Sequence, residues 1–235
     1  MSMLSRFATL GGGVATDPYW NNVSYLLVGN GANGTTTNIK DSSKNNLTTT
    51  IIGNTATSTA QNKYGSGSVY FDGSGDYLTL PSTALLNFGT GDFTIEAWVQ
   101  LPSSANVSYI LCGFGTPNNY VAVYKINATT YVLEYYDEHH DVLSTTTFGL
   151  NTFVYLTVVR SSNTVTLYVN GIGSSATNTG SITWGTSSTP LYIGSSPAYA
   201  GSYEWRGYIY DLRITKGVAR YTSNFTPPTA PLPIG

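Results

Sequence analysis

Charged side chains are scarce in this sequence. Asp, Glu, Lys and Arg make up 9% of the 235 residues, and the formal net charge at pH 7 is −2. A protein that binds duplex nucleic acid places a cluster of Lys and Arg against the phosphates, and the sequence contains no such cluster. We therefore expect no nucleic-acid partner.

Long hydrophobic runs are also missing. No stretch approaches the roughly 20 apolar residues that span a bilayer, and the apolar patch at residues 7–10 is shorter than the roughly 7–15 residues of a signal-peptide core. We therefore expect neither a membrane span nor a signal peptide. The single cysteine, Cys112, ends an apolar stretch and is expected to be a buried thiol without a disulfide partner.

The clearest pattern that is present lies at residues 92–101, where apolar and polar side chains alternate. This period of two predicts a β-strand, and the absence of Gly and Pro is typical of a central one. Its apolar face consists of Phe93, Ile95, Ala97, Val99 and Leu101. Many further short strands, separated by turn signals such as Asn170-Gly171, predict an all-β sandwich or barrel.

The two ends of the chain differ from the rest. Residues 1–18 form a Gly-rich, extended arm that cannot build a core by itself. We expect this arm to attach the protein to a particle or to another subunit, through Arg6, Phe7 and Leu10. Residues 19–228 are predicted to form one domain, and residues 229–235 a Pro-rich tail.

Four motifs resemble the laminin-G-like branch of the concanavalin A-like lectin/glucanase superfamily. In chain order they are Phe-Asp-Gly-Ser-Gly-Asp-Tyr-Leu (71–78), Phe-Thr-Ile-Glu-Ala-Trp-Val (93–99), Leu-Tyr-Val-Asn-Gly (167–171) and Gly-Tyr-Ile-Tyr-Asp-Leu-Arg-Ile-Thr (207–215). The resemblance spans residues 19–228 and implies a jelly roll of two antiparallel sheets, with the first strand near the last. The segments at 17–20 and 220–228 are similar to versions found in tailed-bacteriophage virion proteins.

The sequence lacks the residue patterns that glycoside hydrolysis and serine-nucleophile catalysis require. Glycoside hydrolysis needs two carboxylates about 5–10 Å apart, and the hydrolases of this superfamily carry them in a Glu-x-Asp-x-(x)-Glu run. No glutamate outside the turn at 137–141 has an acidic neighbour at that spacing, and the chain has no Gly-x-Ser-x-Gly elbow. We therefore predict a protein that is not an enzyme, in which Glu96 has a structural role.

Two groups of residues are candidates for metal binding. The turn at 137–141, Asp-Glu-His-His-Asp, is expected to be a solvated hairpin tip, with a transition-metal site as the alternative. Asp41 and Asp211 resemble positions at which related jelly rolls tie the chain ends with Ca²⁺, and Asp72 is a third candidate ligand. The alternative for each aspartate is that it caps its own turn.

Large aromatic side chains gather in two Gly- and Ser-rich stretches. Tyr199, Tyr203 and Trp205 lie in one of them, and Trp184 lies in the other. Exposed rings with polar neighbours are suited to sugar binding, but Tyr and Trp are equally favoured at subunit interfaces. Sugar binding, an interface and packing within the domain remain open for these four residues.

Two hypotheses for function follow. In the first, the protein is a non-enzymatic virion structural protein, a capsid decoration or accessory protein that is assembled in the host cytoplasm. It would be a homo-oligomer attached to capsid or tail proteins through residues 1–18. In the second, it is a carbohydrate-binding adhesin or tail component that recognises host-surface glycans. The expected cofactor is a structural Ca²⁺.

Overall fold

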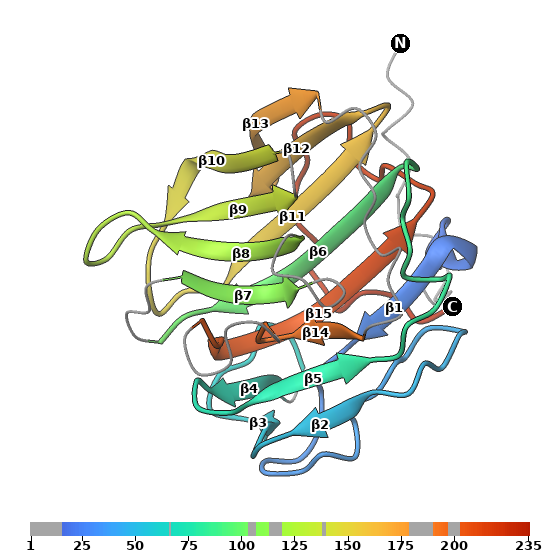
Figure 1. Cartoon of the computed structure of the whole chain (residues 1–235). Helices are drawn as coiled ribbons and strands as arrows, with labels where there is room; N and C mark the ends of the chain where they lie inside the picture. The colour runs from blue at the N-terminus through green and yellow to red at the C-terminus, as the bar shows by residue number, and fades with distance from the viewer. Residues whose placement is uncertain are drawn as a thin grey trace.

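Two antiparallel sheets lie face to face and form a sandwich (Figure 1). This computed structural model describes residues 16–65, 67–102, 107–112, 119–137, 140–178, 190–196 and 203–235. The prediction of an all-β jelly roll is confirmed, since these residues contain strands and one short 3-10 helix, η1 (Trp20–Asn22). No helix within these ranges has the length and apolar composition that crossing a bilayer requires.

The strands divide unequally between the two sheets. The larger sheet contains β1 (Val23–Leu27), β3 (Ala56–Ser58), β4 (Ser68–Asp72), β6 (Phe93–Gln100), β11 (Val154–Ser161), β12 (Thr164–Val169), β13 (Ile172–Asn178) and β15 (Arg206–Lys216). Its order is β13-β12-β11-β6-β15-β4-β3, and β1 also pairs with β15. The smaller sheet contains β2 (Thr50–Ile52), β5 (Tyr77–Leu80), β7 (Val107–Cys112), β8 (Tyr120–Lys125), β9 (Tyr131–Asp137), β10 (His140–Phe148) and β14 (Leu191–Ile193). Its order is β10-β9-β8-β7-β14-β5-β2.

Strand β6 lies at the centre of the larger sheet, between β11 and β15, as its sequence predicts. Its five alternating apolar residues, from Phe93 to Leu101, pack in the core between the two sheets. The opposite face carries Glu96 and Trp98, which are also buried. Trp98 is covered because Tyr64 and Phe225 pack over this outer side of the sheet.

Two strands were not predicted from the sequence. Strand β3 has only three residues, and β13 is rich in Ser, Thr and Gly and has no apolar alternation. Both strands form because a neighbour supplies the hydrogen-bonding partner: β3 pairs with β4, and β13 pairs with β12. The turn between β12 and β13 is the predicted Asn170-Gly171 turn, with both residues at positive φ.

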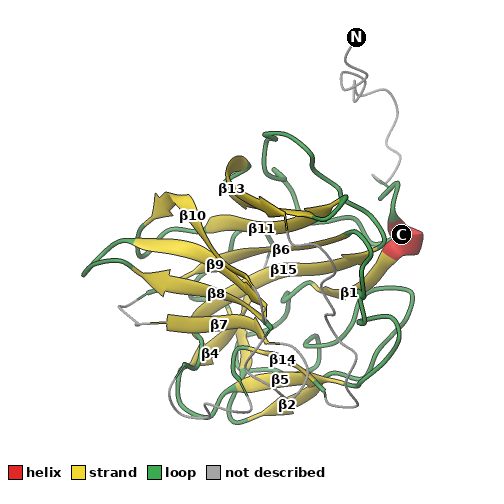
Figure 2. Cartoon of the chain, turned by 45° about the horizontal axis from the view of Figure 1, so that its top comes forward, coloured by secondary structure: helices red, strands yellow, loops and turns green. Residues whose placement is uncertain are grey.

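The two ends of the described chain pack onto the sandwich and meet each other (Figure 2). Strand β1 pairs with β15, so the first strand lies beside the last, as expected. Asp17, which we assigned to the arm, is buried, and its backbone N–H donates to the carbonyl oxygen of Gly235 at 3.2 Å. Leu232, in the predicted tail, packs against Val23 and Leu26. Packing therefore continues past the expected boundaries at 18 and 228. Arg6, Phe7 and Leu10 lie outside the described residues.

Candidate functional site

Glu96 is part of a buried charged cluster on the outer side of the larger sheet. Its carboxylate accepts hydrogen bonds from the Tyr155 hydroxyl at 2.6 Å and from Arg213 Nε at 2.8 Å. Arg213 and Arg220 both also bind Asp17, at 2.9 and 2.8 Å. Burial opposes ionisation of Asp17, but the hydrogen bond from Arg220 and the charge of Arg213 outweigh it and lower the pKa of Asp17. The predicted structural role of Glu96 is confirmed, and the cluster binds the start of the domain to its central strands.

Each of the three aspartates proposed as calcium ligands accepts hydrogen bonds from protein groups. Asp41 accepts backbone N–H groups of Leu26, Ser43 and Leu47 at 2.8–3.1 Å, which is the capping role given as the alternative. The carboxylate of Asp72 accepts hydrogen bonds from two donors, the Ser74 N–H and the Asn54 side chain.

Asp211 has positive φ, and its Oδ2 accepts the Leu232 N–H at 2.7 Å. Burial raises the pKa of Asp211 to about 7. Within the described ranges, no three acidic, His or Cys side chains gather into a group that could hold a metal ion. A structural Ca²⁺ held by Asp41, Asp211 and Asp72 stays a prediction.

The turn at 137–141 is only partly described, since Glu138 and His139 lie outside the described residues. His140 Nδ1 lies 2.9 Å from Oδ1 of Asp137. Asp137 is 2% exposed, so this end of the turn is less solvated than expected.

Of the four candidate sugar-binding aromatic residues, the structure describes Tyr203 and Trp205. Trp184 and Tyr199 lie outside the described residues. Trp205 is 0% exposed, and its ring belongs to the core between the sheets. Its backbone N–H donates to Gly194 O at 2.7 Å. Of the three alternatives left open for Trp205, packing within the domain is the one that the structure shows. Burial of the large apolar ring in the core removes it from any sugar-binding surface or subunit interface. Tyr203 is partly buried and packs on Tyr109.

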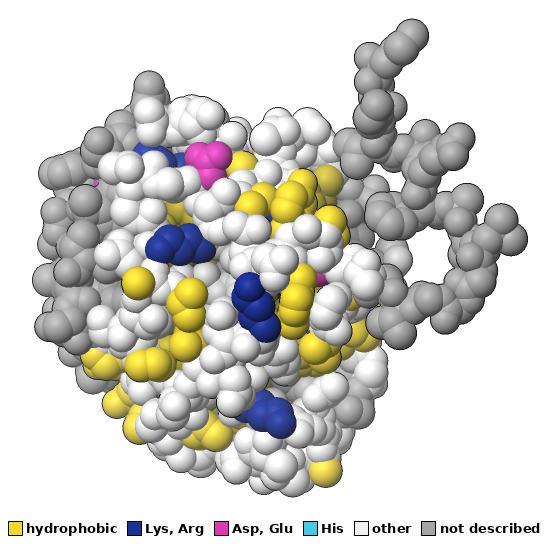
Figure 3. All heavy atoms as spheres, turned by 90° about the vertical axis from the view of Figure 1, so that its right-hand side faces the viewer, with side chains coloured by type: hydrophobic (Ala, Val, Ile, Leu, Met, Phe, Trp, Pro, Cys, Tyr) yellow, Lys and Arg dark blue, Asp and Glu magenta, His cyan; other side chains and the backbone are white. Residues whose placement is uncertain are grey.

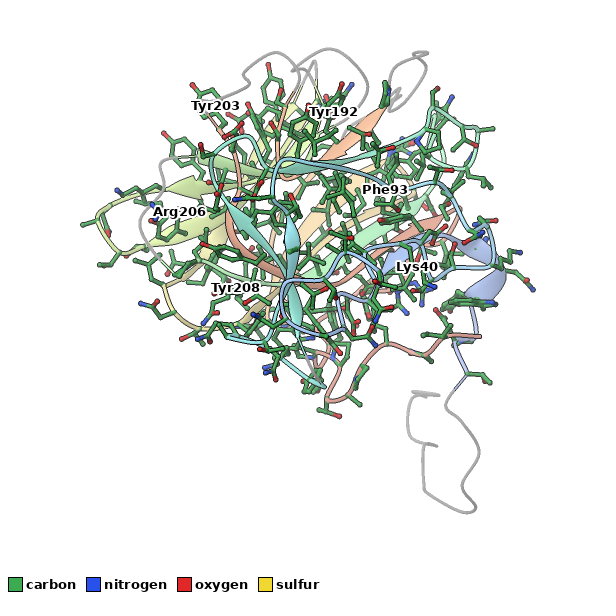
Figure 4. All side chains as sticks on the ribbon, turned by 90° about the horizontal axis from the view of Figure 1, so that it is seen from below. Lys40, Phe93, Tyr192, Tyr203, Arg206 and Tyr208 are labelled. Atoms are coloured by element: carbon green, nitrogen blue, oxygen red, sulfur yellow. The ribbon has the colours of Figure 1, made fainter. Side chains whose placement is uncertain are left out.

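The outer surface of the smaller sheet carries a row of tyrosines. On each strand they alternate with core residues, as Tyr192 does between Leu191 and Ile193. We call this set the tyrosine face: Tyr77, Tyr109, Tyr120, Tyr136, Tyr192 and Tyr203. Figure 4 shows Tyr192 and Tyr203 on one side of the sandwich and Tyr208, of the larger sheet, toward the other.

The rings of the tyrosine face form two contact groups. The first runs across β9, β8 and β7 and continues to Tyr203. Its ring centroids are 5.0 Å apart for Tyr136 and Tyr120, 4.8 Å for Tyr120 and Tyr109, and 5.5 Å for Tyr109 and Tyr203. The second group is the pair Tyr77 and Tyr192, 5.7 Å apart. Apart from Tyr109, which is 4% exposed, all of these side chains are partly exposed.

One carboxyl group lies within the first ring group. Glu134 is opposite Ala122 on β8, and its Oε1 accepts the Tyr120 hydroxyl at 3.2 Å. Its other oxygen, Oε2, is buried and has no hydrogen-bond partner among the described residues. Burial and the nearby Asp141 raise the pKa of Glu134 to about 7, and burial with the Glu134 charge raises the pKa of Tyr120. The face thus combines aromatic rings with one carboxyl that is easily protonated near neutral pH.

The tyrosine face was missed at the sequence level except for Tyr203. A signal was present, because Tyr109, Tyr120 and Tyr136 each begin or end an apolar strand pattern. Only the pairing of β7, β8 and β9 brings these residues together.

A family model described as the concanavalin A-like lectin/glucanases superfamily matches residues 72–220. No protein of curated function matches the sequence significantly. Many solved structures resemble the fold.

The binding domain of Paraclostridial Mosquitocidal Protein 1 has a TM-score of 0.65 and 14% identity over 85% of this chain. Domain 4 of AbnA, a GH43 extracellular arabinanase from Geobacillus stearothermophilus, solved in complex with arabinotriose, has a TM-score of 0.59 and 15% identity over 84% of this chain. The ligand binding domain of Botulinum neurotoxin serotype D, solved in complex with N-acetylneuraminic acid, has a TM-score of 0.58 and 13% identity over 86% of this chain.

These matches differ in extent. The chain spans 50% of the mosquitocidal and 49% of the neurotoxin chain but 94% of the arabinanase domain. At such low identity they establish the shared fold. Because the family model covers well over half of the sequence, the chain belongs to the concanavalin A-like lectin/glucanases superfamily.

Proposed function

We propose that this protein is a non-catalytic binding domain that recognises glycans on the tyrosine face. The observation that carries the proposal is the row of tyrosine rings, all but that of Tyr109 partly exposed, across five neighbouring strands of one sheet. Ligand sites are typically lined by aromatic side chains with a few placed polar groups. Here the tyrosine hydroxyls and Asp141 supply polar groups at the same surface.

The similar structures support a sugar as the ligand class. The arabinanase domain was solved with arabinotriose, and the serotype D toxin domain with N-acetylneuraminic acid. These ligands belong to those proteins. The arabinanase domain is the more relevant support, because this chain covers almost all of its length.

The acidic groups of this face support binding without hydrolysis. Glu134 and Asp141 are diagonal neighbours on β9 and β10, so two carboxyl groups do share the surface. A glycosidase needs both groups to reach one glycosidic bond. Glu134 is 5% exposed and its Oε2 is enclosed, so of these two described carboxyl groups only that of Asp141 is open to a ligand.

Glycan-array screening followed by calorimetry on the best ligand tests the proposal. Tyr192→Ala removes an exposed ring of the tyrosine face, and we expect it to weaken binding by about tenfold or more. Tyr70→Ala is the matched control, because Tyr70 pairs with Tyr208 at 4.9 Å on the outer side of the other sheet. Equal losses in the two variants, or no glycan bound by the unaltered protein, would contradict the proposal. Turnover of a bound polysaccharide that Glu134→Gln abolishes would contradict its non-catalytic part.

Display on a virus particle stays a prediction from the sequence. Of the arm expected to attach the domain, residues 1–18, the first fifteen lie outside the described part. Deleting them should leave a folded domain that still binds glycan but no longer binds particles. Particle binding that survives the deletion would contradict the attachment role.

A further inference from the structure

A concave surface lies at the end of the sandwich that carries η1. It is a pocket of about 320 Å³, at the lower end of the range for small-molecule sites. Its walls come from η1, the start of β1, the loop after Asp41, and the end of β15. They include Asn21, Asn22, Lys44, Asn45, Leu85 and Lys216. Figure 1 shows η1 at the opposite end of the molecule from β8, β9 and β10, so the pocket is separate from the first ring group of the tyrosine face.

Two lysines from distant parts of the chain line this pocket. Lys44 Nζ donates to Asn21 Oδ1 at 3.1 Å, and Lys216 Nζ donates to Ala84 O at 2.5 Å. Both acceptors are neutral, and among the described residues neither lysine forms an ion pair. An ammonium group has three donors, so each lysine retains donors and an uncompensated positive charge.

The rest of the pocket wall is neutral and held in place. Asn22 Nδ2 donates to Lys216 O at 3.1 Å, and Asn45 Nδ2 donates to the carbonyls of Val23 and Ser24. No Asp or Glu is among the lining residues. Figure 3 looks onto this side of the molecule, where Lys and Arg side chains are spread over the surface and few acidic ones are visible. This local charge is opposite in sign to the net charge of the protein, −2.

We propose that the pocket binds a small anionic group, a carboxylate, sulfate or phosphate, through Lys44 and Lys216. Two ammonium groups at one concavity, without a carboxylate among the lining residues to neutralise them, attract an anion, and their spare N–H donors match its oxygens. The anion can be free or part of an acidic sugar. The proposal does not depend on glycan binding at the tyrosine face.

Nuclear magnetic resonance titrations with three probes test this site: inorganic sulfate, glucuronate and glucose. We expect sulfate, glucuronate or both to shift the backbone amide signals of Asn22, Lys44 and Gly217, and glucose to leave them unchanged. A response to both anions or to sulfate alone indicates a general anion site, and a response to glucuronate alone indicates an acidic-sugar site. Binding should weaken as NaCl is raised, because salt screens the lysine charges.

Charge-removing variants complete the test. Lys44→Gln should weaken anion binding by about tenfold, because a charge-assisted hydrogen bond is lost, and Lys44→Gln/Lys216→Gln should abolish it. Lys40→Gln, an equal charge change at an exposed residue outside the pocket, is the control and should bind normally. Thermal unfolding checks that each variant is folded.

Three results would overturn the proposal: no shift with either anion, an equal response to glucose, or unchanged anion binding in the folded double variant. Tyr192→Ala separates the two proposals, because it should impair glycan binding at the tyrosine face and leave anion binding intact.

Discussion

The Tyr120 hydroxyl donates a 3.2 Å hydrogen bond to Oε1 of Glu134, while Oε2 of the same carboxyl is buried without a partner among the described residues. An ionised carboxylate in this position loses its hydrating water, and the protein offers a hydrogen-bond donor to Oε1 but none among the described residues to Oε2. Burial therefore raises the pKa of Glu134 to about 7. A measurable pH dependence of stability follows.

Stability should fall as pH rises from about 4.5 to about 7. Glu134 has an ordinary pKa of 4.5 and a folded pKa of about 7, so the folded protein holds more protons than the unfolded chain in this window. Glu134→Gln should flatten the slope and stabilise the protein near pH 8, by an upper limit of about 3 kcal/mol. In the variant, Asp211 should account for the remaining dependence of stability on pH, because its pKa is also raised to about 7. Urea unfolding at several pH values measures this, and an unchanged slope in the variant would contradict it.

Trp205→Ala should destabilise the fold rather than act at a binding surface. The ring is fully buried in the core, so its removal leaves a cavity and should lower the free energy of unfolding by about 3–5 kcal/mol. Tyr192→Ala, on the outer surface, should cost clearly less. Urea denaturation compares the two variants, and a cost below about 1 kcal/mol for Trp205→Ala would show that the ring is not in the core.

Arg213→Met should cost about 3–5 kcal/mol, because it leaves the buried carboxylates of Glu96 and Asp17 with fewer partners. Adding Glu96→Gln to Arg213→Met should recover part of this loss, since one buried charge is then removed as well. Chemical denaturation of the single and double variants measures the coupling. Strictly additive costs would mean that Arg213 and Glu96 do not stabilise each other.

Asp41→Ala should lower stability by the same amount with calcium and with a chelator. The Asp41 carboxylate accepts hydrogen bonds from three backbone N–H groups. Removing the carboxylate leaves these donors without their acceptor, at a cost of about 1–3 kcal/mol in total. Thermal unfolding of both proteins in each buffer separates this cap from a metal site. A melting temperature that falls with chelator in the unaltered protein alone would assign Asp41 to calcium instead.

Local sequence patterns predicted those strands whose own residues alternate between the core and the outer surface. The alternation from Phe93 to Leu101 indicated both the strand and its buried face, because core packing repeats every second residue. Strand β13 could not be predicted in this way, since its pairing with β12 and not its own side chains makes it a strand.

The candidate sites depend on contacts between distant residues. Tyr120 and Tyr136 stack because β8 and β9 pair, and Lys44 and Lys216 line one pocket because β1 lies beside β15. The burial of Trp205 likewise depends on the opposite sheet. None of these three contacts can be inferred from a few consecutive residues. The sequence therefore predicted the architecture better than the binding surfaces.

The hydrogen bond between the backbones of Asp17 and Gly235 has a practical consequence. Because residues 17 and 235 lie together, a short linker can join them in a domain trimmed to 17–235, and that domain can be spliced into an exposed loop of a host protein without being stretched. The same geometry permits a circularly permuted form with new ends in the turn between β8 and β9, where residues 126–129 are exposed. Such a form would leave Asp17, Arg213 and Arg220 in contact and move the fusion points to the end of the sandwich opposite η1.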